Sequence, residues 1–152
     1  MRRVVITGLG VVSPIGNSCL EVLHSLKNGI SGIGFSEEMS ERGFRSQVSG
    51  NLKIDVSEKI DKRILRFMGP GAAYAYIAMT QAIEDAGLGS KDVVNYRTGL
   101  IAGSGGPSTS AILAAHQTVL EKGSTKRIGP FAVPKCMSST VSANLATAFQ
   151  IK

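Results

Sequence analysis

The chain begins with a run of apolar strand formers that no polar residue interrupts. Val4, Val5 and Ile6 make up this run, and a second one, TGLIAGS, covers residues 98–104. A run without polar alternation is typical of a strand that is covered on both faces, as in a parallel sheet. The pattern therefore predicts two buried strands, each followed by a corner rich in glycine.

Apolar residues at helical spacing mark much of the remaining chain. The best-defined segment is rich in alanine and lies between Pro70, which suits a first helical turn, and Gly87, which suits a helix stop. Asn17 stands where an N-cap is expected, ahead of the first helical segment. Strands that alternate with such helices indicate an α/β layered fold. The helices are predicted over residues 18–28, 57–68, 70–86, 107–122 and from near 134 onward.

The other segments add little to the predicted sheet. Residues 47–52 suit a short edge strand, residues 30–35 a glycine-punctuated loop, and residues 37–45 a polar surface excursion. These strands are too few to cover the predicted helices, because a doubly wound sheet usually has about five strands or more. The sequence also ends directly after the last predicted helix, so we expect it to be one part of a longer chain.

The composition is that of an ordinary globular protein. Of the 152 residues, 43% are hydrophobic and 18% are charged, and no stretch approaches the ~20 apolar residues of a membrane span. Cys19 and Cys136 are far apart and form no CxxC pattern, which suits a reducing compartment and predicts neither a disulfide framework nor a zinc site. We therefore expect a cytoplasmic protein with no membrane association.

Two glycine-rich corners raise the question of nucleotide binding. Gly8-Leu9-Gly10 follows the first apolar run, but Ser13 stands where a dinucleotide fingerprint needs its third glycine. Residues 103–106 precede a predicted helix, yet they lack the lysine of a P-loop. Backbone geometry therefore explains these glycines better than a phosphate cradle does.

Candidate catalytic groups are sparse. Cys19 and Cys136 are the candidate nucleophiles, and His24 and His116 lie in the bodies of predicted helices. A base must reach its nucleophile to activate it, and nothing in the spacing brings a histidine to a cysteine. Because no metal-binding constellation is present either, these residues are interpreted as packing cysteines and surface histidines.

The formal net charge of +6 includes two basic clusters. The clusters are Lys62, Arg63 and Arg66, and Lys122, Lys126 and Arg127. Helical spacing of three and four residues places members of the first cluster side by side. A solvated basic surface and a docking face for an acidic protein both fit this pattern, whereas no exposed aromatic residue is expected nearby to support single-stranded nucleic acid.

Several motifs become specific when they are taken together. VVITGLGVVSPIGN covers residues 4–17, RFM covers 66–68, QAIEDAGL covers 81–88 and GLIAGSGG covers 99–106. With GPFAVPKCMSS at 129–139, they resemble the β-ketoacyl-acyl-carrier-protein synthases, and this last motif is more similar to the type I form of the bacterial fatty-acid pathway than to type II. The resemblance extends over the whole chain, in order and at family spacing.

The resemblance implies a thiolase-like fold of two halves, each a mixed or parallel sheet between helices, with residues 1–152 forming most of the first half. It implies an acyltransferase of bacterial fatty acid biosynthesis that is a homodimer when complete and needs no cofactor. In this family a cysteine takes an acyl group from acyl carrier protein, and two histidines assist decarboxylating Claisen condensation with malonyl-loaded carrier protein. No position of this sequence matches those three residues, so the chain alone is expected to be inactive.

The resemblance also gives roles to residues that are present. Met137 matches a residue that reaches across the dimer interface to line an acyl pocket, and Gly106 matches the small residue that faces the same tunnel. Pro107 departs from the family pattern, which often continues with glycine. The basic positions that receive acyl carrier protein are matched by Lys62, Arg63, Arg66 and Lys126.

Two other classes of function stay open at this point. A non-catalytic thiolase-fold partner, similar to a chain-length factor, would share the fold and lack the nucleophile. A basic nucleic-acid-binding module is the alternative that is not an enzyme. Retention on acyl carrier protein compared with heparin and DNA separates the carrier-protein partner from nucleic acid.

Overall fold

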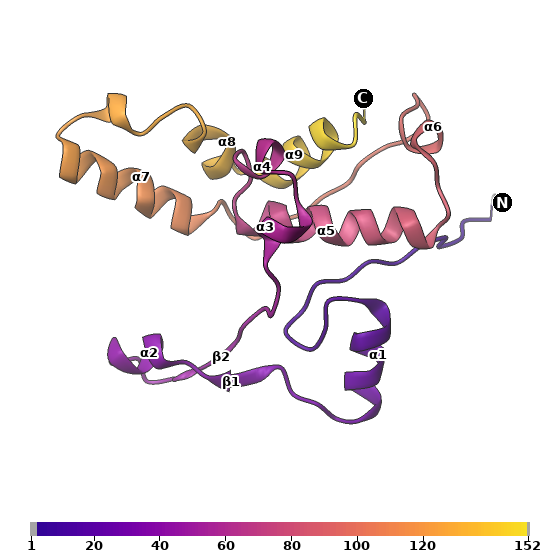
Figure 1. The fold of residues 1–152 in the computed structure, drawn as a ribbon, viewed down its shortest axis with the longest axis horizontal. Helices are drawn as coiled ribbons and strands as arrows, with labels where there is room; N and C mark the ends of the chain where they lie inside the picture. The colour runs from indigo at the N-terminus through magenta and orange to yellow at the C-terminus, as the bar shows by residue number, and fades with distance from the viewer. Residues whose placement is uncertain (1–2, 152) are drawn as a thin grey trace. The chain divides into compact units, whose positions relative to one another are not determined.

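The computed structural model describes residues 3–151, which form two compact units (Figure 1). The first unit comprises the residues up to Asp55 together with Ala78–Ala86, and the second comprises Val56–Ile77 and the residues from Gly87 onward. None of the helices described by the structure is both long enough and apolar enough to cross a membrane.

Helices dominate both units. The first unit contains α1 (Cys19–Lys27), β1 (Ile33–Phe35), α2 (Glu37–Glu41) and β2 (Val48–Gly50). The second contains α3 (Val56–Lys59), α4 (Lys62–Leu65), α6 (Ser90–Val93), α7 (Thr109–Lys122), the 3-10 helix η1 (Thr125–Arg127), α8 (Ala132–Cys136) and α9 (Thr140–Ala148). Helix α5 (Pro70–Asp85) contributes to both units and confirms the prediction over 70–86, and Gly87 follows it in the left-handed conformation at a φ of 64°.

Local capping explains where α1 begins and ends. The Ser18 hydroxyl oxygen accepts a hydrogen bond from the Glu21 N–H at 3.2 Å, so the N-cap is Ser18, and the prediction of Asn17 is wrong by one residue. Asn17 instead donates from its side-chain amide to the Lys53 carbonyl at 2.9 Å. Gly29 follows the helix with a φ of 62°, as its position in the sequence predicts.

The two apolar runs that were predicted as buried strands do not form strands in the structure. Val4 is 91% exposed, Ile6 is 83% exposed and Ile101, in the run 98–104, is fully exposed. Neither run pairs with a strand among the described residues. The prediction is wrong for residues 3–151 taken alone because strand-forming side chains give a strand only where a neighbouring strand takes up the backbone hydrogen bonds.

The sheet that the structure describes is a two-stranded antiparallel hairpin in the first unit. Its second strand, β2, confirms the edge strand predicted over 47–52. Its first strand corrects the loop predicted over 30–35, because Ile33 and Phe35 pair with Gly50 and Val48. The presence of a partner thus decides which extended segment becomes a strand.

The glycines at the N-terminal corner allow the chain to lie directly against α5. A Cβ atom added to Gly10 would collide with the Ala78 carbonyl oxygen, and one added to Gly8 would collide with the Ala82 carbonyl oxygen. All four residues belong to the first unit. Close approach of two backbones therefore explains Gly8 and Gly10, which confirms the prediction that backbone geometry requires them. The same prediction is not borne out for Gly103, Gly105 and Gly106, where an added Cβ would meet no atom within 4 Å.

Polar side chains of α5 hold the same segment by its backbone. The Leu9 N–H donates to the Asp85 carboxylate at 2.9 Å, and the Val11 N–H donates to the Gln81 side-chain oxygen at 3.0 Å. The Gln81 side-chain amide then donates to the Asn17 carbonyl at 2.7 Å. The extended segment therefore takes its hydrogen bonds from helix side chains, which stand in for part of a neighbouring strand.

Two segments predicted as single helices are each divided. Over 57–68, α3 ends at Lys59 and α4 begins at Lys62, after the N-cap Asp61, whose carboxylate accepts the Arg63 N–H at 2.7 Å. The segment from 134 onward gives α8 and α9, and the Thr140 hydroxyl donates to the Pro134 carbonyl at 2.6 Å across the break. Side chains that bond to backbone groups at each break explain why helical spacing alone overestimates both helices.

The core of the second unit draws its apolar side chains mainly from α5, α9 and the turns before α5. Tyr76 of α5 stacks on Phe149, the residue after α9, with ring centroids 5.0 Å apart. The buried Asn144 side chain is satisfied, since it donates to the Thr140 carbonyl at 2.8 Å. The buried apolar residues are Ile60, Met68, Ala72, Ala73, Ile77, Val93, Val141 and Leu145.

Candidate functional site

The first basic cluster lies on and just after the short helix α4. Lys62 and Arg63 belong to the helix, Arg66 is its C-cap, and all three residues are exposed. No carboxylate in the described part of the chain forms a salt bridge with any of them. Because exposed cations without ion-pair partners attract anions over several ångströms, this face is suited to a negatively charged partner.

Arg66 is held by two aromatic rings. Its guanidinium carbon lies 5.0 Å from the ring centroid of Phe67 and 5.0 Å from that of Phe131. The two rings meet edge to face, with centroids 5.1 Å apart and planes at 90°. Both distances fall within the ~6 Å over which a cation is attracted to a ring face. The end of α4 is thereby connected to Phe131, the N-cap of α8.

A hollow of about 430 Å³ is lined in part by Arg66. Three cationic side chains line it, those of Lys62, Arg66 and Lys135, and its lining includes no carboxylate. The rest of the lining is mostly apolar and includes Val56, Leu65, Met68, Ala73 and Tyr74. A group that combines negative charge with an apolar side chain would match this hollow.

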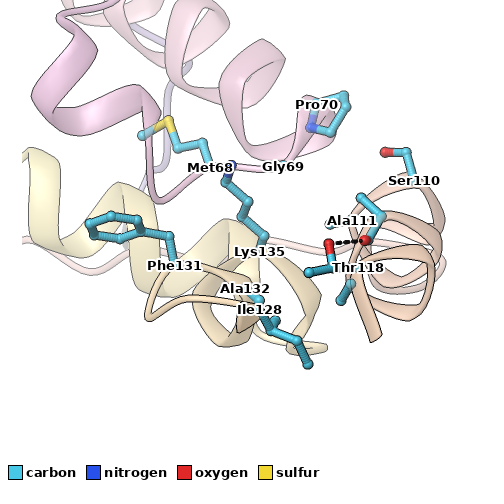
Figure 2. Close-up of a pocket in the computed structure, with 12 residues that line it drawn as sticks. Met68, Gly69, Pro70, Ser110, Ala111, Thr118, Ile128, Phe131, Ala132 and Lys135 are labelled. Carbon is cyan, nitrogen blue, oxygen red and sulfur yellow. Dashed lines mark hydrogen bonds between the residues drawn. The ribbon is translucent and has the colours of Figure 1, made fainter. Parts of the chain in front are cut away.

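Lys135 also lines a second hollow, of about 390 Å³, between α7, α8 and the turn before α5 (Figure 2). Figure 2 shows the Lys135 side chain extending from α8 toward Met68 and Gly69. The segments approach closely here, since a Cβ on Gly69 would lie 2.8 Å from the Ser108 Cβ. Lys135 therefore lines both of these hollows.

The residues expected to face an acyl tunnel are not brought together. Gly106 lines a separate hollow of about 390 Å³ with Ser108, Thr140 and Val141. Met137 caps the C-terminus of α8 and is not among the residues that line it. Lys126 lies in η1, is exposed and does not line the hollow around Arg66. The roles of these residues stay predictions.

Groups with chemical reactivity do not converge among the described residues. No hydrogen bond joins a cysteine to a histidine there, and the Cys19 thiol lies 3.6 Å from the Leu9 carbonyl oxygen. His24 and His116 are exposed, as predicted, and Cys136 is half-buried. Cys19 is exposed, so its interpretation as a packing cysteine is wrong. No three potential metal ligands gather in residues 3–151. What the described residues offer is a charged face and apolar hollows, which are features for binding.

Comparison with known proteins identifies the family. The model of the β-ketoacyl synthase N-terminal domain matches residues 1–152. The chain belongs to the β-ketoacyl synthase family. A 3-oxoacyl-acyl-carrier-protein synthase 1 of Haemophilus influenzae is 51% identical over 152 residues, which are 100% of this chain and 37% of the relative. The chain thus spans little more than a third of that synthase.

Solved ketosynthases have the same fold. A β-ketoacyl synthase from Burkholderia phymatum superposes with a TM-score of 0.83 at 28% identity, over 100% of this chain and 38% of the other. A type II PKS acyl-carrier protein in complex with its ketosynthase gives a TM-score of 0.73 at 16% identity, over 96% of this chain and 38% of the other. The resemblance to the synthase family and the thiolase-like fold class, first half only, are both confirmed.

Sequence reasoning identified the cations of the basic face at α4 but missed Phe131, which holds Arg66, and Lys135, which adds a third cation to the hollow. Phe131 and Lys135 are four residues apart, a spacing that places two side chains on one helix face. Their helix, α8, was expected to begin only near Pro134. A helix start placed before Pro134 would have put Lys135 on the same face as Phe131, whose ring contacts Arg66.

Proposed function

We propose that the full-length protein is a β-ketoacyl-acyl-carrier-protein synthase of bacterial fatty acid biosynthesis and that it acts in the cytoplasm. Identity of 51% across all 152 residues to a synthase 1 is the observation that carries this proposal. The described residues supply binding surface, and the catalytic cysteine and both histidines are expected in the rest of the protein. No part of the reaction is therefore assigned to Cys19 or Cys136.

The proposed reaction has two stages. An acyl group passes from the thiol of a carrier protein to the cysteine, which forms a new thioester and frees the carrier thiol. Malonyl-loaded carrier protein then loses carbon dioxide, and the resulting carbanion attacks the cysteine thioester. A carbon–carbon bond forms, the cysteine thiol leaves, and the ketoacyl group stays on the second carrier protein. This chain's own part is to receive the carrier protein.

The test of the activity uses the purified full-length protein with acyl-loaded and malonyl-loaded carrier protein. Ketoacyl carrier protein is the expected product, measured by mass spectrometry of the carrier. Replacement of the catalytic cysteine by alanine should abolish product formation. If the unmodified protein binds carrier protein but forms no product, a non-catalytic partner similar to a chain-length factor becomes the better assignment.

For the partner, we infer that Lys62, Arg63, Arg66 and Lys126 receive the acidic carrier protein, and that the full-length enzyme is a homodimer. The support is electrostatic: the chain has a formal charge of +6, and the α4 cations are exposed without salt bridges among the described residues. A structural relative is itself a ketosynthase with a bound acyl-carrier protein.

Reversal of one charge tests this partner. Arg63→Glu in the full-length protein should weaken binding of acyl carrier protein about tenfold at low salt, because a repulsion replaces an attraction. Lys91→Glu, at an exposed lysine of α6, is the matched control and should bind as the unmodified protein does. Calorimetric titration at two salt concentrations measures both. Tighter retention on heparin and DNA than on carrier protein would instead favour a nucleic-acid module.

A further inference from the structure

We propose that Phe67 and Phe131 are positioning residues that hold the Arg66 guanidinium at the rim of a three-cation hollow, with Lys135 as the third cation. The occupant of this hollow is an acidic segment of the carrier protein that also presents an apolar side chain. This inference rests on the carrier-protein partner proposed above, and it adds three residues to which the resemblance gave no role: Phe67, the α8 N-cap Phe131, and Lys135 of α8.

The geometry of Arg66 carries the first step. A free arginine side chain samples many rotamers. Binding that fixes the side chain in one of them therefore costs conformational entropy. Here the guanidinium carbon lies 5.0 Å from each of two ring centroids, and the rings fix one another edge to face at 90°. The guanidinium is thus already oriented before a partner arrives, while Arg66 stays exposed.

The lining of the hollow carries the second step. Lys62, Arg66 and Lys135 come from α4 and α8, and all three line the hollow of about 430 Å³. No acidic side chain lines it, so its cations are not neutralised by their own surroundings. Its apolar lining, which includes Leu65 and Met68, gives an apolar side chain somewhere to be buried. Charge complementarity therefore favours an acidic protein segment over a neutral apolar ligand.

Two substitutions at Phe131 separate positioning from structural support. Phe131→Leu removes the ring and should weaken carrier-protein binding about two- to fivefold, the range expected for one exposed cation–π contact. Phe131→Tyr keeps a ring and should restore the affinity of the unmodified protein. Phe149→Leu removes a half-buried ring that stacks on Tyr76 and is the matched control, with unchanged affinity expected. Calorimetric titration of each full-length variant gives the affinity, and circular dichroism verifies folding.

A double-mutant cycle with Arg66→Ala provides the decisive readout. If Phe131 acts through Arg66, then Phe131→Leu should have no further effect once Arg66 is alanine. Equal weakening in both backgrounds would overturn the positioning role, and so would full affinity of the Phe131→Leu protein. Failure of the unmodified protein to bind carrier protein would overturn the partner itself, a distinct result. Lys135→Gln should lower affinity and its salt dependence, and an unchanged salt dependence would remove Lys135 from the hollow's function.

Discussion

At the scale of single residues, Gly106 is a position where size alone can be varied. A Cβ added there would meet no atom within 4 Å, and its backbone is not in the left-handed region. The described residues around Gly106 therefore leave room for a larger side chain. Any effect of such a side chain should fall on what enters the hollow that Gly106 lines with Ser108, Thr140 and Val141.

We predict that Gly106→Phe in the full-length protein, if it is the proposed synthase, shifts the products to shorter acyl chains. The ring would take up space in the proposed tunnel, while the local fold tolerates it. Gas chromatography of the products measures chain length, and thermal unfolding checks that stability is kept. Gly34→Phe makes the same change in β1, where open space also surrounds the residue, and should leave product length unaltered. Products of normal length from Gly106→Phe would remove Gly106 from the tunnel.

At the scale of elements, the contact between the N-terminal segment and α5 depends on the absence of side chains. Gly10→Ala would drive a methyl group into the Ala78 carbonyl, so the segment would have to move away from the helix. The hydrogen bonds from Leu9 and Val11 to α5 side chains would then lengthen.

We predict that Gly10→Ala lowers the free energy of unfolding by about 1–3 kcal/mol, the usual cost of overpacking. Urea denaturation of the full-length protein, followed by circular dichroism, measures the change. Gly34→Ala should be tolerated, because nothing lies within 4 Å of its added Cβ. If Gly10→Ala and Gly34→Ala were equally stable, the close approach would not be what requires glycine at residue 10.

Signals that act within a few residues made some elements predictable. Gly29, Gly87 and Gly123 each follow a helix at positive φ, as their positions in the sequence predict. The breaks at Asp61 and before Thr140 were missed because a capping side chain competes with helical spacing. Strands were predicted least well, because a strand forms only when it pairs with another strand, and the local sequence does not identify that partner.

The residues of the candidate site also divide into those that local sequence patterns predict and those that they do not. Lys62, Arg63 and Arg66 form a local cluster, so helical spacing was enough to find it. Phe131 reaches Arg66 across 65 positions of sequence, and its ring makes that contact only because the fold brings α8 to the end of α4. No pattern along the chain encodes such a pairing. Residues contributed by distant segments were accordingly the ones missed.

At the scale of the whole molecule, large apolar side chains are exposed at the two unpaired runs. Val4 is 91% exposed and Ile101 is fully exposed, although both were expected in a buried sheet. Such exposure is unusual for a chain that works alone, because contiguous apolar surface promotes association. It fits a chain that matches 37% of a synthase.

We predict that the 152-residue chain, when produced alone, forms no ketoacyl product and binds the dye ANS more strongly than the full-length protein does. The expected nucleophile and histidines are missing from it, and its apolar runs are exposed. Mass spectrometry of carrier protein and dye fluorescence measure the two effects. Condensation by the 152 residues alone would contradict the assignment of catalysis to the rest of the enzyme.

The side chain of Gln81 uses both ends of its amide, since it accepts from the Val11 N–H and donates to the Asn17 carbonyl. A carboxylate of identical shape could keep the first bond but would set a negative oxygen against a carbonyl oxygen in place of the second. Hydrolysis of this one amide, as in slow deamidation, would therefore turn an attraction into a repulsion without changing the size of the side chain. Chemical ageing of the protein at this position would loosen the N-terminal segment from α5.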